Sequence, residues 1–164
     1  MKRLILMRHA KSDWFTDEEE DFKRPLNTRG RRDAPRMGKW LRDHRYLPDM
    51  VLCSSAVRTR ETLALTGIEA ETEFMPSLYH APASRMLDIL RHDASGDTVM
   101  MIGHNPGISV FAQDILDVSP MDTKFRQYPT AAILIVDFGT EDWADAGWAT
   151  GQMVDFVYPK SLPS

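Results

Sequence analysis

The 164-residue sequence has few of the features that mark disulfide-rich, metal-binding, membrane or nucleic-acid-binding proteins. Its one cysteine, Cys53, excludes an internal disulfide, and no CxxC or HExxH spacing offers a metal site. No stretch approaches the roughly 18 uninterrupted apolar residues of a membrane span. The net charge of -4 argues against sequence-independent binding to nucleic acid. We therefore expect a cytoplasmic protein with no cofactor, metal, membrane or nucleic-acid partner.

The order of apolar and polar segments predicts the fold class. A chain of this length is about one domain, and we expect residues 1–164 to form a single one. Short apolar runs with polar boundaries predict buried strands at 4–7, 50–53, 99–102 and 131–138. Helical patterns lie between them, at 34–41, 56–66, 84–92 and 106–116. This alternation predicts an α/β three-layer sandwich, a mostly parallel sheet with helices on both faces. We expect the aromatic-rich tail at 143–158 to add an antiparallel edge strand.

The first helix has two candidate starts. Asn27 and Asp33 are both residue types that cap helix N-termini. Pro35 fits a first turn but would kink the interior of a helix, so its position leaves both starts open.

Polar residues directly follow three of the predicted strands. Arg8 and His9 follow the first, the segment 54–62 follows the second, and His104 follows the third. Because the carboxyl ends of parallel strands meet at one edge of a sheet, these residues should lie close together. A cation and an imidazole at the edge of a core are costly unless they are paired or bind an anion. This edge is therefore the predicted anion site.

A phosphoryl group suits these residue types. Guanidinium and imidazole donors clamp phosphoryl oxygens while a nucleophile attacks in line. We expect Arg8, Arg58 and His104 to bind the oxygens and His9 to be the nucleophile. For His9 to attack, one ring nitrogen must be unprotonated, which normally requires the other to donate to a backbone carbonyl. Neighbouring arginines disfavour protonation of the ring and so keep the nucleophile neutral.

The remaining histidines and the cysteine receive other interpretations. His44 and His92 lie at predicted helix C-termini, where an imidazole suits the helix dipole. His80 lies in a loop, and its role stays open. Only four residues, none of them glycine, separate Cys53 from Arg58, whereas cysteine-dependent phosphatases use a five-residue loop there. Cys53 is therefore interpreted as a buried strand residue.

Two charged segments stand out between the first strand and the first helix. An acidic run covers 17–21, and arginines are frequent from 24 to 42. We interpret them as a solvated loop and a solvated helix face. The alternative is a docking surface for a protein partner.

Four motifs occur in one order along residues 3–107. They are Arg8-His9-Ala10; Arg24-Pro25-Leu26-Asn27-Thr28-Arg29-Gly30; Ser54-Ser55 with Arg58 and Glu61-Thr62; and Gly103-His104-Asn105-Pro106. In this order they resemble the motifs of the histidine phosphatase superfamily. The small size of the chain and the sequence of residues 7–12 are most similar to the SixA-type phosphohistidine phosphatases of that superfamily. The resemblance implies a phosphoglycerate mutase-like fold and a phosphohistidine intermediate on His9. It also implies phosphoryl binding by Arg8, Arg58 and His104, without a metal.

The sequence departs from other branches of that superfamily at three places. Ala10 replaces the usual glycine, and Phe15 stands where the mutase branch tends to have a substrate-binding asparagine. The segment 76–83 lacks the glutamate that donates a proton in the mutase and broad phosphatase branches. An alkoxide leaving group needs acid assistance worth roughly 10²-fold to 10⁴-fold, whereas a phosphoramidate needs less. The departures favour an N-linked phosphate, with His80 as a candidate substitute donor.

The leading prediction is a phosphatase that removes phosphate from phosphohistidine on a protein, such as a histidine-phosphorylated signalling domain. One alternative is a hydrolase of a small phosphorylated or pyrophosphorylated metabolite, because a pyrophosphate leaving group also needs little acid. The other is a non-catalytic module that binds phosphorylated ligands. The intact pair of His9 and His104 speaks against the latter, since a pure binder needs the cations more than the nucleophile.

Overall fold

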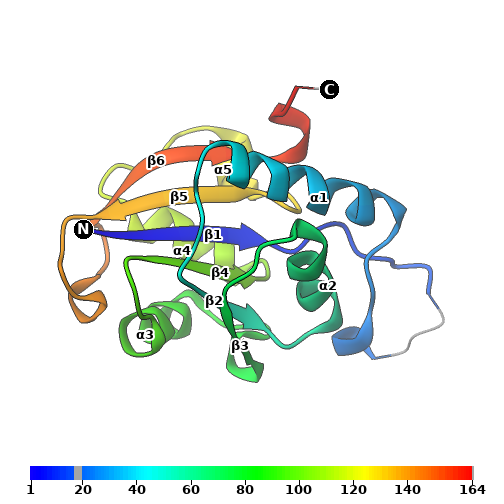
Figure 1. Cartoon of the computed structure of the whole chain (residues 1–164), viewed down its shortest axis with the longest axis horizontal. Helices are drawn as coiled ribbons and strands as arrows, with labels where there is room; N and C mark the ends of the chain where they lie inside the picture. Colours follow the sequence, from blue (N-terminus) through cyan, green and yellow to red (C-terminus); the bar gives the residue numbers. More distant parts are fainter. Residues whose placement is uncertain (17–19, 164) are drawn as a thin grey trace.

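The structure is a computed structural model that describes residues 1–16 and 20–163, with all six strands in one sheet (Figure 1). In chain order the strands are β1 (Lys2–Arg8), β2 (Met50–Ser54), β3 (Glu71–Met75), β4 (Thr98–Gly103), β5 (Ile133–Phe138) and β6 (Gly151–Val157). Their order across the sheet is β3-β2-β4-β1-β5-β6. The first four of these are parallel neighbours, and β5 and β6 pair antiparallel.

Helices cover both faces of this sheet (Figure 1). They are α1 (Thr28–Asp43), α2 (Val57–Thr66), α3 (Ala83–Asp93), α4 (Gly107–Ile115) and α5 (Thr123–Gln127). Alternate side chains of β1 enter two separate cores: Leu4 and Leu6 pack with residues of α3, α4 and α5, and Ile5 and Met7 pack with residues of α1 and α2. The expected α/β fold, mostly parallel with helices on both faces, is confirmed.

The sequence patterns found most of these elements and missed two. The four apolar runs correspond to β1, β2, β4 and β5, and the tail forms the antiparallel edge strand β6 as expected. The apolar run that ends at Phe138 predicts a buried strand, but the pattern does not indicate the direction of that strand. In the structure this strand, β5, pairs antiparallel with β1. The edge strand β3 was not predicted because most of its side chains are exposed and its sequence lacks an apolar run. The five-residue helix α5 is too short to show a helical period.

The first helix begins at the earlier of its two candidate starts. The Asn27 side chain caps α1 by accepting a hydrogen bond from the Gly30 amide at 2.9 Å. The helix continues through Pro35. Asp33 is buried inside it, and arginines one turn away and next to it approach its carboxylate at 3.3 to 3.5 Å: Arg29, Arg32 and Arg36.

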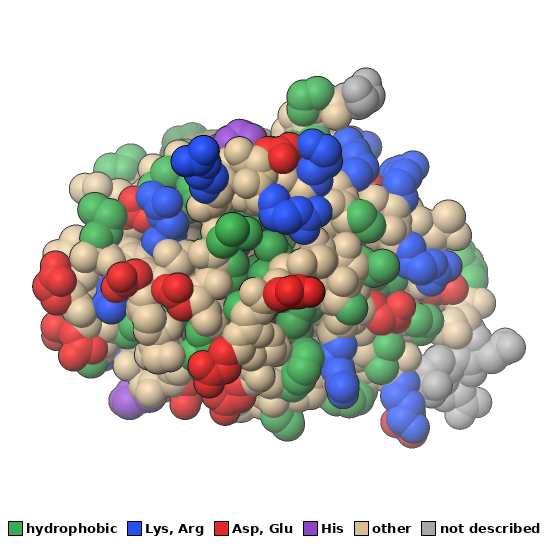
Figure 2. All heavy atoms as spheres, viewed as in Figure 1, with side chains coloured by type: hydrophobic (Ala, Val, Ile, Leu, Met, Phe, Trp, Pro, Cys, Tyr) green, Lys and Arg blue, Asp and Glu red, His purple; other side chains and the backbone are tan. Residues whose placement is uncertain are grey.

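Lys and Arg side chains gather over α1 on the face seen in Figure 2. Most of the helix's arginines are exposed, as both the solvated face and the alternative docking surface require. Residues 17–19 of the acidic run lie outside the described residues.

The two histidines predicted at helix ends lie there. The Nδ1 atom of His44, at the end of α1, is 2.9 Å from the Trp40 carbonyl, and that of His92, in the last turn of α3, is 2.7 Å from the Asp88 carbonyl. Cys53 is buried in β2, and burial raises the pKa of its thiol to about 12. A thiol with that pKa is a poor nucleophile, which confirms its structural interpretation. No helix in the described ranges is both long and apolar enough to span a bilayer.

Gly38 sets how closely α1 approaches α2. A Cβ atom at this position would lie 2.0 Å from the Thr66 carbonyl oxygen of α2. We expect Gly38→Ala to lower the free energy of unfolding by about 1–3 kcal/mol, because the two helices must separate. Urea unfolding measures the loss. Gly139→Ala is the control, since a Cβ there has nothing within 4 Å, and an equal loss in both variants would contradict the close-approach explanation.

Candidate active site

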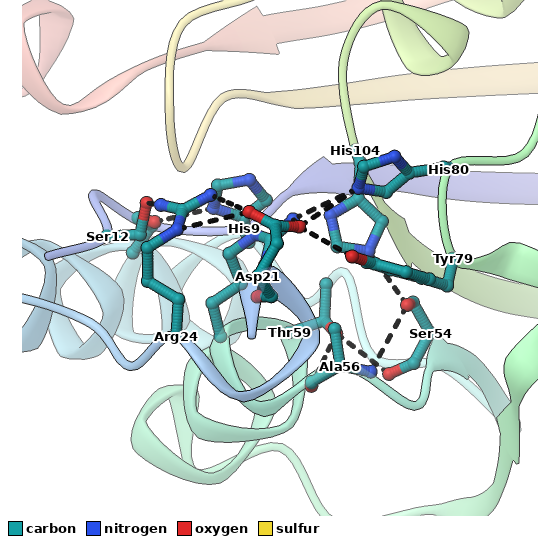
Figure 3. A network of polar contacts seen from close by, with 12 residues as sticks. His9, Ser12, Asp21, Arg24, Ser54, Ala56, Thr59, Tyr79, His80 and His104 are labelled. Carbon is teal, nitrogen blue, oxygen red and sulfur yellow. Dashed lines mark hydrogen bonds and ion pairs between the residues drawn. The ribbon is translucent and has the colours of Figure 1, made fainter. Parts of the chain in front are cut away.

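The parallel pairing of β1 with β4 brings the first and third polar segments together. Arg8 lies opposite Gly103 in the register, and the His9 amide donates to the Gly103 carbonyl at 3.2 Å. His104 follows immediately, so the two imidazole rings have centroids 5.3 Å apart. On the other side of β4, β2 ends at Ser54, and α2 begins at 57 (Figure 3). All three strand ends therefore meet at one edge.

A pocket of about 200 Å³ lies at this edge. The five side chains predicted as catalytic, substrate-binding or proton-donating all line it: Arg8, His9, Arg58, His80 and His104. Further lining residues include Lys11, Ser12, Trp14, Asp21, Arg24 and Asn105. Within the described residues, no group of three or more His, Cys, Asp or Glu side chains is placed to hold a metal ion.

His9 has the orientation that a nucleophile needs. Its Nδ1 atom is 2.7 Å from the Ala10 carbonyl oxygen, so Nδ1 carries the proton and donates it. Nε2 is then unprotonated. Burial lowers the pKa of His9 well below its ordinary value, and the charges of Arg8 and Arg58 add to this effect. The ring is therefore neutral at pH 7, as the sequence argument requires.

His104 presents a donor to the pocket. Its Nε2 is 2.8 Å from the Ser54 hydroxyl, which accepts from the Ala56 amide and can therefore donate its own proton to the ring. With Ser54 as the donor to Nε2, the ring proton lies on Nδ1, a buried atom with no hydrogen-bond partner within the described residues. Burial, together with the charge of Arg58, lowers the pKa of His104 to about 3.

The two predicted arginine clamps also have unused donors. Arg8 donates from Nη1 to the Tyr128 carbonyl at 3.0 Å, and burial lowers its pKa to about 10 with help from the charge of Arg58. The Nε atoms of Arg8 and Arg58 are buried without a hydrogen-bond partner in the described part of the chain. Leaving such donors unsatisfied is costly. An oxyanion bound between these arginines and His104 would satisfy them.

Sequence reasoning missed a carboxylate in this pocket. Asp21, the last residue of the acidic run, receives hydrogen bonds from Tyr79 Oη at 2.6 Å and from Arg58 Nη2 at 3.0 Å (Figure 3). Arg24 donates to it at 2.8 Å, and His80 Nε2 lies 3.1 Å from it. Burial alone would raise its pKa, but the bonds from Tyr79 and Arg24 and the charge of Arg58 hold that pKa well below the usual range.

The interpretation of Asp21 as part of a merely solvated acidic loop is therefore wrong. No sequence signal separates it from the four acidic residues before it, because Arg58 and Tyr79, which bind it in the pocket, lie 37 and 58 positions away. Arg24 was also missed, although it belongs to one of the ordered motifs. It is buried, donates to the Ser12 hydroxyl, and lies with its guanidinium carbon 3.6 Å from the centre of the Trp14 ring.

Comparison with known proteins places this arrangement in a family. Residues 4–79 match the model of the histidine phosphatase superfamily (branch 1). An uncharacterized protein from Mycobacterium tuberculosis is 36% identical over 160 residues, covering 94% of this chain and 100% of its own length. The chain belongs to the histidine phosphatase superfamily.

Solved structures place the histidine phosphatase in its SixA-type branch. A protein from Nakamurella multipartitia assigned to the SixA phosphohistidine phosphatases is 30% identical, with a TM-score of 0.85 over 96% of each chain. The protein histidine phosphatase SixA complexed with tungstate has the same fold at 22% identity, with a TM-score of 0.73 over 98% of this chain and 99% of that one. The resemblance inferred from the motifs is therefore confirmed.

The histidine phosphatase motifs beside the pocket hold its backbone in place. Thr62 of α2 accepts a hydrogen bond from the Ala10 amide at 3.0 Å, and Glu61 accepts one from the Leu26 amide at 3.2 Å. Gly30 is required because a Cβ there would lie 2.1 Å from the Lys11 carbonyl oxygen. Phe15, in contrast, is 98% exposed and does not line the pocket.

The neutral, buried His104 predicts acid-sensitive stability. The unfolded chain takes up a proton on this residue below about pH 6.5, whereas the folded histidine phosphatase does so only near pH 3. Stability is therefore lost as the pH falls, by on the order of 2 kcal/mol between pH 7 and 5 for this residue. Urea unfolding of the wild type and His104→Gln at both pH values measures it, with a smaller loss expected in the variant. Equal losses would contradict the assignment.

Proposed function

We propose that this histidine phosphatase hydrolyses phosphohistidine on a protein through a phosphohistidine intermediate on His9. The observation that carries the proposal is the hydrogen bond from His9 Nδ1 to the Ala10 carbonyl, because it leaves an unprotonated Nε2 in a pocket walled by cations. The SixA proteins with similar structures are described as phosphohistidine or protein histidine phosphatases, which supports the same substrate class.

In the first step, the Nε2 lone pair of His9 forms a bond to phosphorus while the bond from phosphorus to the leaving nitrogen breaks. Arg8 and Arg58 hold two of the phosphoryl oxygens. The Nδ1–H group of His104 donates a hydrogen bond to the third oxygen. These three groups stabilise the charge on the oxygens as the phosphoryl group is transferred. The enzyme is then phosphorylated on His9, and the substrate histidine is free.

The leaving group receives little acid assistance. Asp21, the carboxyl group that lines the pocket, is ionised and has no proton to give. His80 is the other candidate proton donor at the exposed side of the pocket, and its Nε2 atom lies 3.1 Å from Asp21 Oδ2. This supports a substrate whose leaving group departs as an imidazole rather than as an alkoxide.

In the second step, water attacks the phosphorus atom of phosphorylated His9 from the side that the substrate has left. His80 accepts the water proton, and Asp21 stabilises the resulting imidazolium. The P–N bond to His9 then breaks, phosphate is released, and the neutral His9 is restored.

A protein substrate fits the open side of the pocket. The His80 side chain is 58% exposed, and Trp14 is 66% exposed at the rim. A phosphorylated side chain can therefore reach His9 while the rest of a protein partner stays outside. The Nδ1 and Nε2 atoms of a histidine project its phosphoryl group far enough from the backbone for this approach.

Substitution of the nucleophile gives the decisive test. We expect His9→Ala to lower phosphate release from a histidine-phosphorylated carrier protein by at least roughly 10³-fold, because it removes the nucleophile that takes the phosphoryl group. The assay follows phosphate release without added metal, with an aryl phosphate in parallel. His92→Ala, an exposed histidine on α3, is the matched control and should keep the wild-type rate. Unchanged release by His9→Ala would refute the proposal.

Two other outcomes would select the alternatives. Rates on pyrophosphates above those on the carrier protein would indicate a metabolite hydrolase. Binding without phosphate release and without a phosphorylated His9 would indicate a non-catalytic module.

Loss of one clamp should weaken both binding and rate. Arg58→Ala removes a guanidinium from the phosphoryl oxygens, so we expect kcat/KM on the carrier protein to fall by roughly 10²-fold to 10³-fold. Steady-state kinetics should show a higher KM together with a lower kcat. Wild-type values of both would overturn the assignment of Arg58 to the clamp.

A further inference from the structure

Asp21 lies on the side of the pocket where the leaving group departs. His9 is 6% exposed at the floor of the pocket, whereas the side chains of Asp21 and His80 are 37% and 58% exposed at its mouth. An in-line displacement expels the leaving group on the side opposite the nucleophile. With His9 at the floor, that side is the mouth.

The carboxylate at this mouth is ionised and fixed in position. Asp21 is the carboxylate among the described residues that line the pocket, and donors from three elements face it: Arg24 on its own segment, Arg58 on α2, and Tyr79 and His80 after β3. The bond from Arg58 Nη1 to the Asp21 backbone carbonyl, at 2.7 Å, holds the main chain of this residue as well. The carboxylate is therefore held in place by its neighbours.

An imidazole ring already rests on this carboxylate. His80 Nε2 is 3.1 Å from Asp21 Oδ2 and 3.5 Å from Arg58 Nη2, and Figure 3 shows the ring beside Asp21 at the rim of the network. His80 is the most exposed of the four partners of Asp21, so its ring is the one that an entering group can displace. The ring of a substrate histidine has the same size and the same N–H donor.

We infer that Asp21 determines leaving-group specificity: its carboxylate accepts a hydrogen bond from the protonated ring of a phosphohistidine substrate and repels groups that depart as anions. This inference rests on the proposed function and names the residue that would select the substrate class. The remaining arguments concern the two kinds of leaving group.

A phosphohistidine ring with a proton on its second nitrogen is a cation. When its P–N bond breaks, the electron pair returns to the leaving nitrogen, and the ring departs as neutral imidazole with its N–H intact. Without that proton the ring would depart as an imidazolate anion, a much poorer leaving group. A carboxylate that binds the N–H favours the reactive form.

A phosphate ester behaves in the opposite way. As its P–O bond breaks, the electron pair and the negative charge move onto the departing oxygen. That charge would develop beside the ionised Asp21, and like charges at close range raise the energy of the transition state. The same carboxylate should therefore favour one substrate class and disfavour the other.

Asp21→Asn tests this directly, because it removes the charge and keeps the shape of the side chain. We expect kcat/KM on a phosphohistidine-containing peptide to fall about tenfold, the value of a lost hydrogen bond to a charged group. On p-nitrophenyl phosphate, kcat/KM should equal or exceed that of the wild type. The ratio of the two values is the main readout.

The pH profile gives a second readout that a structural role would not change. In the wild type, phosphohistidine turnover should fall at alkaline pH as the substrate ring loses its proton. Asp21→Asn no longer stabilises that proton, so the fall should move to lower pH. Profiles from pH 6 to 9 with the same peptide measure the shift.

Two variants serve as controls. Asp13→Asn makes the same change of charge in the segment between β1 and α1, at a side chain that accepts from the Phe15 amide and does not line the pocket. It should retain wild-type rates on both substrates. Tyr79→Phe removes a donor to Asp21 but leaves the carboxylate, so it should retain the wild-type substrate ratio even if both rates change.

The outcomes separate this inference from the proposed function. If the wild type releases no phosphate from the peptide but hydrolyses other phosphates, the proposed function fails. Suppose instead that the wild type hydrolyses the peptide, that Asp21→Asn lowers kcat/KM equally on both substrates, and that the fall of activity at alkaline pH does not shift. Asp21 then only positions Arg58. The specificity inference is then overturned while the proposed function stands.

Discussion

The parallel register of β1 against β4 is the constraint on which the pocket depends. It pairs Arg8 with Gly103 and lets the His9 amide donate to the Gly103 carbonyl, so the two strand ends stop at the same level. Both strands are buried on both faces, and a shift of one residue would exchange their two cores. The positions of His9 and His104 are therefore fixed by the packing of the whole sheet.

The second constraint is electrostatic. Three arginines, one lysine and two buried imidazoles line one small pocket, and burial keeps both imidazoles neutral, because protonating either would add a charge where water is excluded. This arrangement leaves buried donors without hydrogen-bond partners, and it makes the folded state less stable in acid. A bound oxyanion would offset part of the free energy lost at the unpartnered donors.

Asp21 places in the pocket a carboxylate that the segment 76–83 lacks. The segment 76–83 contains no carboxylate, but it provides Tyr79 and His80, which bind a carboxylate from the loop after β1. The pocket therefore does contain a carboxylate, but it is ionised and has no proton to donate.

Much of this protein was determined by its sequence alone. The apolar runs gave β1, β2 and β4 because strands buried on both faces need uninterrupted apolar residues, and the residues after them identified Arg8, His9, Arg58 and His104. Only the tertiary structure decided that the run at β5 is antiparallel, that β3 exists as an exposed edge, and that Asp21 belongs to the pocket. Local patterns report burial and helical period, whereas these three facts depend on contacts between residues far apart in the chain.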